Sequence, residues 1–180
     1  MAAPPGPLLV AGLGNIFFGD DGFGVEVARR LAAKRDLGEI ELPDWVTVAD
    51  YGISGMHLAY DLASGYAAAI LVDAAPRGGP PGTVYVIEPE RTPALAEAGG
   101  LAGGALPDAH GMQPDVVLGV LGMLGAGGAR LLVVGCEPAD AGPGIGLSAP
   151  VAAAVDEAVR VVLRLIAGDG WPRTEAALPS

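Results

Sequence analysis

The sequence predicts an α/β fold with three layers (α/β/α), in which a mostly parallel, twisted sheet of about five strands has helices on both faces. Two observations lead to this prediction. Short apolar segments alternate along the chain with longer segments of helical periodicity. The apolar segments are also nearly continuous rather than alternating in polarity, which is typical of parallel strands that are buried on both sides.

The first half of the chain is predicted to contribute strands and helices in strict alternation. The segment 22–34 is interpreted as a helix because Val25, Ala28 and Leu31 fall on one helical face. A glycine-containing turn precedes the second helix, and Asp73 ends the third strand. In chain order, these elements are strand 8–11, helix 22–34, strand 46–49, helix 56–63 and strand 68–72.

The second half begins with a segment, 83–87, that alternates in polarity and follows PRGGPPG, which predicts a strand at an edge of the sheet. The closing helix has Ser148 placed as its N-cap and Pro150 in its first turn, which is a common helix start. The remaining elements are an irregular glycine-rich segment 89–109, a helix 114–124, a strand 131–134 and the closing helix 149–167.

Composition limits the class of protein. The 180 residues suffice for a substantial core, and we expect 1–180 to form a single domain with an ordered core of about 7–168 and loose tails. Hydrophobic residues make up 51% of the chain and charged residues only 17%, which excludes a disordered protein. The single cysteine, Cys136, excludes an internal disulfide and is interpreted as a small apolar residue at a strand end.

Charge and hydropathy narrow the possible partners. The net charge of −11 argues against nucleic acid, whose binding requires clusters of lysine and arginine. The longest uncharged apolar stretch, 116–129, is too short to span a bilayer, and the N-terminus lacks the basic region of a signal peptide. We therefore expect a cytoplasmic protein without a nucleic-acid or membrane partner. The densest basic group is interpreted as the solvated face of the first helix and consists of Arg29, Arg30, Lys34 and Arg35.

Several acidic residues and one histidine are predicted to share one edge of the sheet. Asp20 and Asp21 follow the first strand, Asp50 follows the second and Asp73 ends the third. His110 opens the loop before a later helix. Because ligands of such folds bind beyond the carboxyl ends of the strands, this edge is the candidate site.

The glycine-rich loop after the first strand does not fit a dinucleotide site. In G-x-G-x-x-G the third glycine would stand at position 17, where this chain has Phe17. An acidic pair beside a helix N-terminus would also repel a pyrophosphate. We interpret Gly12 and Gly14 as residues that let the backbone turn tightly after the strand.

Two carboxylates and one imidazole are the candidate ligands. Of Asp20 and Asp21, one is interpreted as the cap of the following helix and the other as part of a site, because adjacent carboxylates repel unless a cation or a donor neutralises them. Asp73 ends an apolar strand, where a carboxylate is costly unless it is hydrogen-bonded or bound to a cation. His110 lies between proline turns, whereas His57 falls in a helical stretch and is interpreted as partly exposed. Such a set suits zinc or nickel and leaves coordination positions open.

Six motifs follow one another in an order typical of one family. They extend over residues 8–166 and read GLGNIFFGDDGFGVEVARRL, DYGISGMHLAYDL, ILVDAAPRGGPPGTV, DAHGMQPDVVL, VVGCEP and GIGLSAPV. In these motifs the chain resembles the nickel–iron hydrogenase maturation endopeptidases. The resemblance implies that Asp21, Asp73 and His110 contact a metal and carry the catalysis, and that Asp20 matches a less critical acidic position. Many relatives have the longer glutamate at the position of Asp21.

The resemblance also implies an activity and a partner. It implies a cytoplasmic protease that removes a C-terminal extension from the precursor of a hydrogenase large subunit after nickel has been inserted. The nickel is then supplied by the precursor, and zinc or another divalent ion could occupy the site in vitro. The carboxylates would activate water as general bases, or a metal would polarise the scissile carbonyl, and the residues do not distinguish these routes. The irregular segment 89–109 is the candidate recognition surface.

Two other functions are compatible with parts of this pattern. A nickel-dependent binding module or chaperone for the precursor would share the site without cleaving. A peptidyl-tRNA hydrolase also starts with a strand and a GLGN loop, but its family has a histidine soon after that loop and a basic surface, and this chain has neither. The mass of the hydrogenase large subunit, with and without this protein after nickel loading, separates the three functions.

Overall fold

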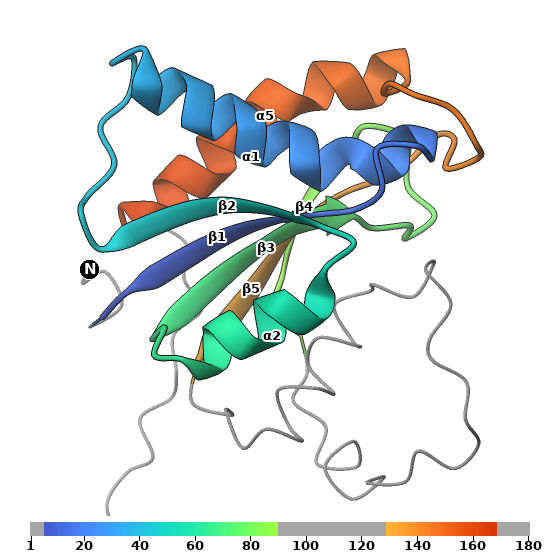
Figure 1. Cartoon of the computed structure of the whole chain (residues 1–180). Coiled ribbons are helices and arrows are strands. Elements are labelled where there is room, and N and C mark those ends of the chain that lie inside the picture. Colours follow the sequence, from blue (N-terminus) through green and yellow to red (C-terminus); the bar gives the residue numbers. More distant parts are fainter. Residues whose placement is uncertain (1–5, 90–128, 169–180) are drawn as a thin grey trace, which may run out of the picture.

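The computed structural model describes residues 6–89 and 129–168, which form alternating strands and helices as predicted (Figure 1). The predicted helix 114–124 and the irregular segment 89–109 lie outside the described residues, except for Pro89. In chain order the elements are β1 (Leu8–Leu13), the short 3-10 helix η1 (Gly19–Gly22), α1 (Phe23–Asp36), β2 (Val46–Gly52), α2 (Gly55–Ala63), β3 (Ala68–Ala74), β4 (Val84–Ile87), β5 (Arg130–Cys136) and α5 (Ala149–Ile166).

The sheet has the strand order β2-β1-β3-β5-β4. The first four strands of this order pair in parallel, and β4 pairs antiparallel with β5, so β4 is the edge strand that the polarity pattern predicted. Gly12 of β1 is in register with Val72 of β3, and Asp73 is in register with Gly135 of β5. The carboxyl ends of β1 and β3 therefore lie side by side in the middle of the sheet.

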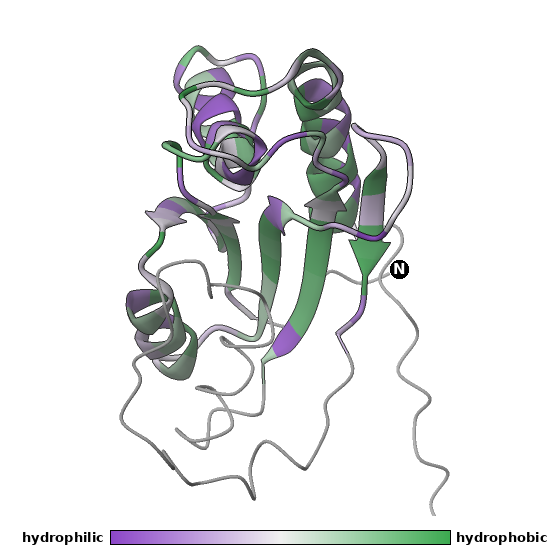
Figure 2. Ribbon diagram, turned by 90° about the vertical axis from the view of Figure 1, so that its right-hand side faces the viewer, coloured by the Kyte–Doolittle hydropathy of each residue, from purple (hydrophilic) through white to green (hydrophobic). Residues whose placement is uncertain are grey.

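Helices cover both faces of the sheet, which confirms the predicted three layers (Figure 1). Side chains of a strand point alternately to its two faces, and β1 divides in this way. Leu8 and Val10 pack under α1 and α5, while Leu9 and Leu13 pack toward α2. Figure 2 shows that apolar residues fill these strands between the helices. This burial on both sides explains why the strands are nearly continuous apolar runs.

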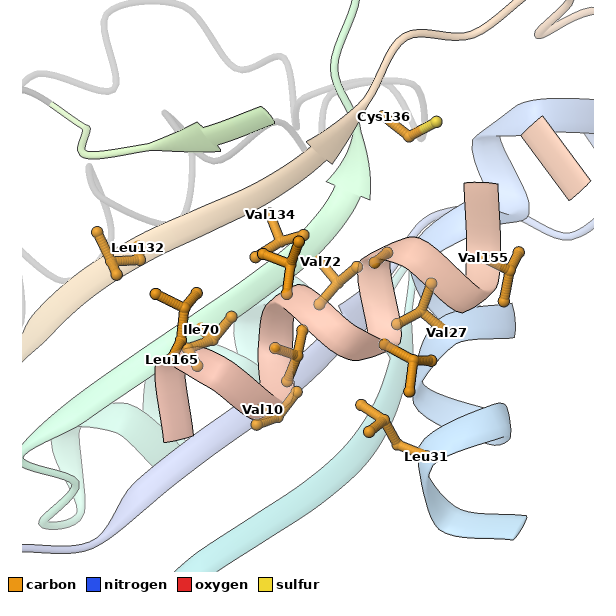
Figure 3. Packing of buried hydrophobic residues seen from close by; sticks show 14 of the residues in the cluster. Val10, Val27, Leu31, Ile70, Val72, Leu132, Val134, Cys136, Val155 and Leu165 are labelled. Carbon is orange, nitrogen blue, oxygen red and sulfur yellow. The ribbon is translucent and has the colours of Figure 1, made fainter. Parts of the chain in front are cut away.

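The larger core lies between the sheet and the pair α1 and α5 (Figure 3). Val27 of α1 and Val155 of α5 pack there with Val134 of β5. Cys136 belongs to the same buried cluster, as predicted for a small apolar residue at a strand end. Burial, with the nearby charges of Asp20 and Glu137, raises the pKa of its thiol to about 11, so it is a poor nucleophile at neutral pH.

Helix α1 approaches the sheet through two glycines. A β-carbon on Gly24 would overlap the carbonyl oxygen of Val72, and one on Gly12 would stand 2.6 Å from the β-carbon of Ala28. Gly12 lies inside β1, so the interpretation that it serves a turn is wrong. Gly12 allows helix and strand to approach closely, so that the start of α1 packs on the carboxyl ends of β1 and β3.

The basic residues of α1 are engaged with acidic partners on the solvent side of the helix. Arg30 lies 3.0 Å from Asp156 of α5, and Arg29 lies 3.3 Å from Asp50 of β2. Lys34 is likewise 3.0 Å from Glu39. These ion pairs agree with the prediction that the group is a solvated helix face.

Across residues 6–89 and 129–168, no helix combines the length and the apolar character that crossing a bilayer requires.

Candidate active site

The candidate site begins with Asp73, the penultimate residue of the central strand β3. Its side chain is only 6% exposed. The backbone N–H of Ala74 donates a hydrogen bond of 2.8 Å to Oδ1 of Asp73. Within the described part of the chain no donor contacts the other carboxylate oxygen, so a buried acidic group at the strand end keeps one oxygen for another partner.

Asp21 reaches the same edge from η1, the short helix that follows β1. The backbone N–H of Asn15 donates to Oδ2 of Asp21 over 2.8 Å, which ties the carboxylate to the turn after the strand. Gly14 lies in that turn with φ of +124°, a conformation that favours glycine. A β-carbon on Gly14 would overlap the carbonyl oxygen of Asp21 and would stand 3.7 Å from Oδ1 of Asp73. Gly14 therefore allows η1 to fold back over the strand end and brings both carboxylates to one place.

The charge of Asp21 acts on the buried carboxyl group of Asp73. Burial raises the pKa of Asp73 well above its usual range, the negative charge of Asp21 raises it further, and the N–H of Ala74 opposes both effects only in part. Two such groups are stable together when one holds a proton or when a cation lies between them. The pair can thus act as an acid and a base, or as two oxygen ligands of a divalent ion.

Asp20 has a structural role, although not the predicted one. It is completely buried, and its two oxygens accept hydrogen bonds from the N–H groups of Ala139 (2.8 Å), Asp140 (2.9 Å) and Ser148 (2.7 Å) and from the hydroxyl of Ser148 (2.8 Å). Burial alone would raise the pKa of Asp20, but these donors outweigh it and lower the pKa. Asp20 thus holds the loop 139–148 against η1.

The side-chain hydrogen bonds that were expected to cap α1 and α5 are absent. Gly22 is the N-cap residue of α1, and no aspartate side chain caps that helix. Ser148 is the N-cap residue of α5, as predicted, but its hydroxyl donates to Asp20 instead of accepting from the helix. The prediction that one residue of the acidic pair is structural agrees with the contacts of Asp20, whereas the capping mechanism is wrong. The assignment of Asp21 to a site stays a prediction.

The other predicted residues are less involved in this site. Asp50 lies inside β2 and not after it, where it pairs with Arg29 and accepts a 3.0 Å hydrogen bond from the N–H of Gly52. His57 is exposed on α2. His110 lies outside the described residues, so the set of Asp21, Asp73 and His110 stays a prediction. Within 6–89 and 129–168, no three His, Cys, Asp or Glu side chains gather closely enough to hold a metal ion.

Glu137, which directly follows β5, is a buried acidic residue that sequence reasoning missed. It accepts hydrogen bonds from the N–H groups of Arg77 (2.8 Å) and Gly78 (3.1 Å) and from the hydroxyl of Tyr85 (3.1 Å). Burial would raise the pKa of Glu137, but these donors lower it overall. Its position after an apolar strand is the same signal that identified Asp73. In Glu137, however, donors occupy both carboxylate oxygens, so this residue stabilises the loop at Arg77 and Gly78.

Comparison with known proteins points to one family. The model of the family described as hydrogenase maturation protease matches residues 25–165. The chain is 31% identical to the hydrogenase expression/formation protein HupD of Rhizobium leguminosarum bv. viciae, over 92% of this chain and 77% of that protein. It is 30% identical to the hydrogenase 2 maturation protease of Escherichia coli, over 91% of this chain and 92% of that protein. The structure of the hydrogenase maturating endopeptidase HybD from E. coli superposes with a TM-score of 0.69 at 30% identity, over 91% of this chain and 94% of that one.

Proposed function

Because this chain belongs to the hydrogenase maturation protease family and is a peptide hydrolase, we propose that it removes the C-terminal extension of a nickel–iron hydrogenase large-subunit precursor after nickel has been inserted. The reaction takes place in the cytoplasm in this proposal, and the precursor is the partner. Relatives named as maturation proteases or endopeptidases support the hydrolytic activity, and the identity of the extension and of the bond that is cut belongs to the proposal.

The observation that carries this proposal is the pairing of Asp21 and Asp73 at the carboxyl ends of β1 and β3. Each carboxylate gives one oxygen to a backbone N–H, from Asn15 and Ala74 respectively. One oxygen of each is left for a ligand within the described part of the chain. Two oxygens, joined by the predicted imidazole of His110, fit a borderline divalent ion such as nickel or zinc.

In this proposal nickel is part of the substrate and not a resident cofactor. A site of two carboxylates and one imidazole lacks thiolates, so it binds a divalent ion weakly enough to release it with the product. Recognition of nickel would restrict cleavage to precursors that are already loaded. Zinc or another divalent ion could occupy the same ligands in vitro.

The chain's own residues can also move the protons of peptide hydrolysis. Burial and the negative charge of Asp21 raise the pKa of Asp73, so this carboxyl group holds a proton more readily than a free aspartate does. In its ionised form, a carboxylate of the pair would take a proton from the attacking water and pass it to the leaving amine. A divalent ion supplied by the precursor would polarise the scissile carbonyl and displace the proton of Asp73.

The test measures the mass of the large subunit. Nickel-loaded and nickel-free precursors are incubated with the wild-type protein, with Asp73→Asn and without protein. We expect loss of the extension only from the nickel-loaded precursor with the wild-type protein. A stable complex with the loaded precursor, without any change in mass, would contradict cleavage and indicate a chaperone.

A peptidyl-tRNA hydrolase is not favoured by any feature of the site. The residues after the GLGN loop that reach the strand edge are Asp20 and Asp21, and neither is a histidine.

A further inference from the structure

Two loops beside the candidate site expose large apolar side chains. Phe17, in the loop after β1, is 60% exposed, and Ile145, in the loop before α5, is 82% exposed. Pro143, two residues before Ile145 in the second loop, is also exposed. We call Phe17, Pro143 and Ile145 the apolar lip.

The two loops pair directly with each other. The N–H of Gly144 donates to the carbonyl oxygen of Phe17, and the N–H of Gly19 donates to the carbonyl oxygen of Gly144, both over 2.8 Å. These bonds form a parallel bridge between Phe18 and Gly144. The bridge joins the two loops at Phe18 and Gly144, so Phe17, which precedes Phe18, and Pro143 and Ile145, which flank Gly144, lie on neighbouring backbone.

Hydrogen bonds fix the backbone of both loops, although the side chains of the lip stay exposed to water. Asp20 binds the second loop through Ala139, Asp140 and Ser148, as described above. The side-chain oxygen of Asn15 accepts a 3.0 Å hydrogen bond from the N–H of Phe17 and fixes the first loop. Large apolar groups that are exposed next to one another typically mark a binding surface.

The apolar lip is connected to the candidate site through Asn15. Asn15, whose side chain fixes Phe17, also donates its N–H to the carboxylate of Asp21. The loop that exposes Phe17 therefore also holds the carboxylate of Asp21, so the lip adjoins the candidate site. The surrounding carboxylates, Asp21 and the exposed Asp140, disfavour an acidic segment.

We propose that the apolar lip binds an apolar side chain of the hydrogenase precursor, in a segment with neutral or basic neighbours, close to the bond that is cut. This inference rests on the proposed function. The lip contributes affinity for the polypeptide, and the carboxylates carry the reaction. Loss of a lip side chain should therefore weaken substrate binding and leave the chemical step unchanged.

The test compares processing kinetics of nickel-loaded precursor by Ile145→Ser and Phe17→Ser with two controls. Leu37→Ser removes an equally exposed apolar side chain (74%) at the far end of α1, and Ile145→Leu keeps the apolar character. We expect KM to rise about tenfold in each lip variant, as for loss of one buried apolar side chain, with kcat near the wild-type value. Leu37→Ser should keep the wild-type KM, and Ile145→Leu should have a KM between those of the wild type and Ile145→Ser. Melting temperatures should be unchanged because all these side chains are exposed.

Several outcomes would overturn the inference. Wild-type KM in both lip variants, while the wild-type protein cleaves normally, would reject the lip and keep the proposed function. A lower kcat at constant KM would mean that the loops position Asp21 instead of binding substrate. A wild-type dimer that Ile145→Ser converts to a monomer, with cleavage unaffected, would assign the lip to contact between copies. Failure of the wild-type protein to cleave would reject the proposed function and the lip together.

Discussion

Gly14 lies so close to Asp21 that a β-carbon on the glycine would overlap the carbonyl oxygen of the aspartate. The same β-carbon position is 3.7 Å from Oδ1 of Asp73. Gly14 is therefore the residue around which the two acidic groups of the site are brought together. Glycine is needed at this position because any side chain would separate η1 from the end of β1.

We expect Gly14→Ala to destabilise the fold and to abolish processing. The positive φ alone costs about 1–3 kcal/mol for a residue with a side chain, and the overlap with Asp21 adds to this. Gly65→Ala is the matched control, since Gly65 has a similar φ of +129° and no atom within 4 Å of its β-carbon position. Thermal unfolding should show a larger loss for Gly14→Ala than for Gly65→Ala. Equal losses would mean that the contact with Asp21 relaxes freely.

Asp73→Asn should raise stability at neutral pH while it abolishes processing. The folded state raises the pKa of Asp73, so the folded protein binds this proton more tightly than the unfolded chain. The stability that this group contributes is complete below its unfolded pKa of about 3.9 and is lost as pH rises toward the raised folded value. The melting temperature of Asp73→Asn, measured with a chelator, should therefore exceed that of the wild type at pH 7 and approach it near pH 4. A constant difference between these pH values would contradict the raised pKa.

Asp20→Ala should lower the free energy of unfolding by at least about 2 kcal/mol, because it leaves several buried donors without a partner. Ser148→Ala is a matched control that removes only the hydroxyl donor and should cost about 1 kcal/mol. The lowered pKa of Asp20 gives the opposite pH dependence to Asp73. Its stabilisation is present above the unfolded pKa and is lost as pH falls through the lower folded pKa. Urea unfolding at pH 7 and at acidic pH measures both effects, and a variant as stable as the wild type would remove Asp20 from the loop contact.

The two histidines should differ in their effect on processing. His110→Ala is expected to prevent cleavage of nickel-loaded precursor, since loss of even an outer-shell partner of a metal typically costs about 10–100-fold. His57→Ala is expected to cleave at nearly the normal rate, because His57 is exposed on α2. Cleavage assays on both variants provide the measurement. The reverse result would require the site to be rebuilt around Asp21, Asp50 and His57.

The purified protein should bind nickel or zinc weakly. The predicted ligand set has no thiolate and only one imidazole, and an ion competes with a proton for Asp73, whose pKa is raised by burial and by the charge of Asp21. Affinity in titration calorimetry should therefore fall with decreasing pH, and dialysis against a chelator should remove the ion. A tight stoichiometric site that survives this dialysis would indicate a resident metal instead.

The sequence by itself determined the order of strands and helices along the chain, and it predicted the edge of the sheet for the candidate site. Apolar periodicity is local, so β3 and α5 could be predicted from neighbouring residues alone. The position of Asp73 followed from the general rule that ligands bind at the carboxyl ends of parallel strands.

Only the tertiary structure decided what each acidic residue does. Asp20 and Asp21 are adjacent in the chain, but the donors that saturate Asp20 come from as far as 128 residues away, at Ser148. Glu137 likewise accepts hydrogen bonds from the backbone N–H groups of Arg77 and Gly78, which precede it by 60 and 59 residues. A carboxylate becomes structural when distant backbone N–H groups occupy its oxygens, and it is left for a ligand when they do not. No local pattern contains that information, because folding alone brings those donors to the carboxylate.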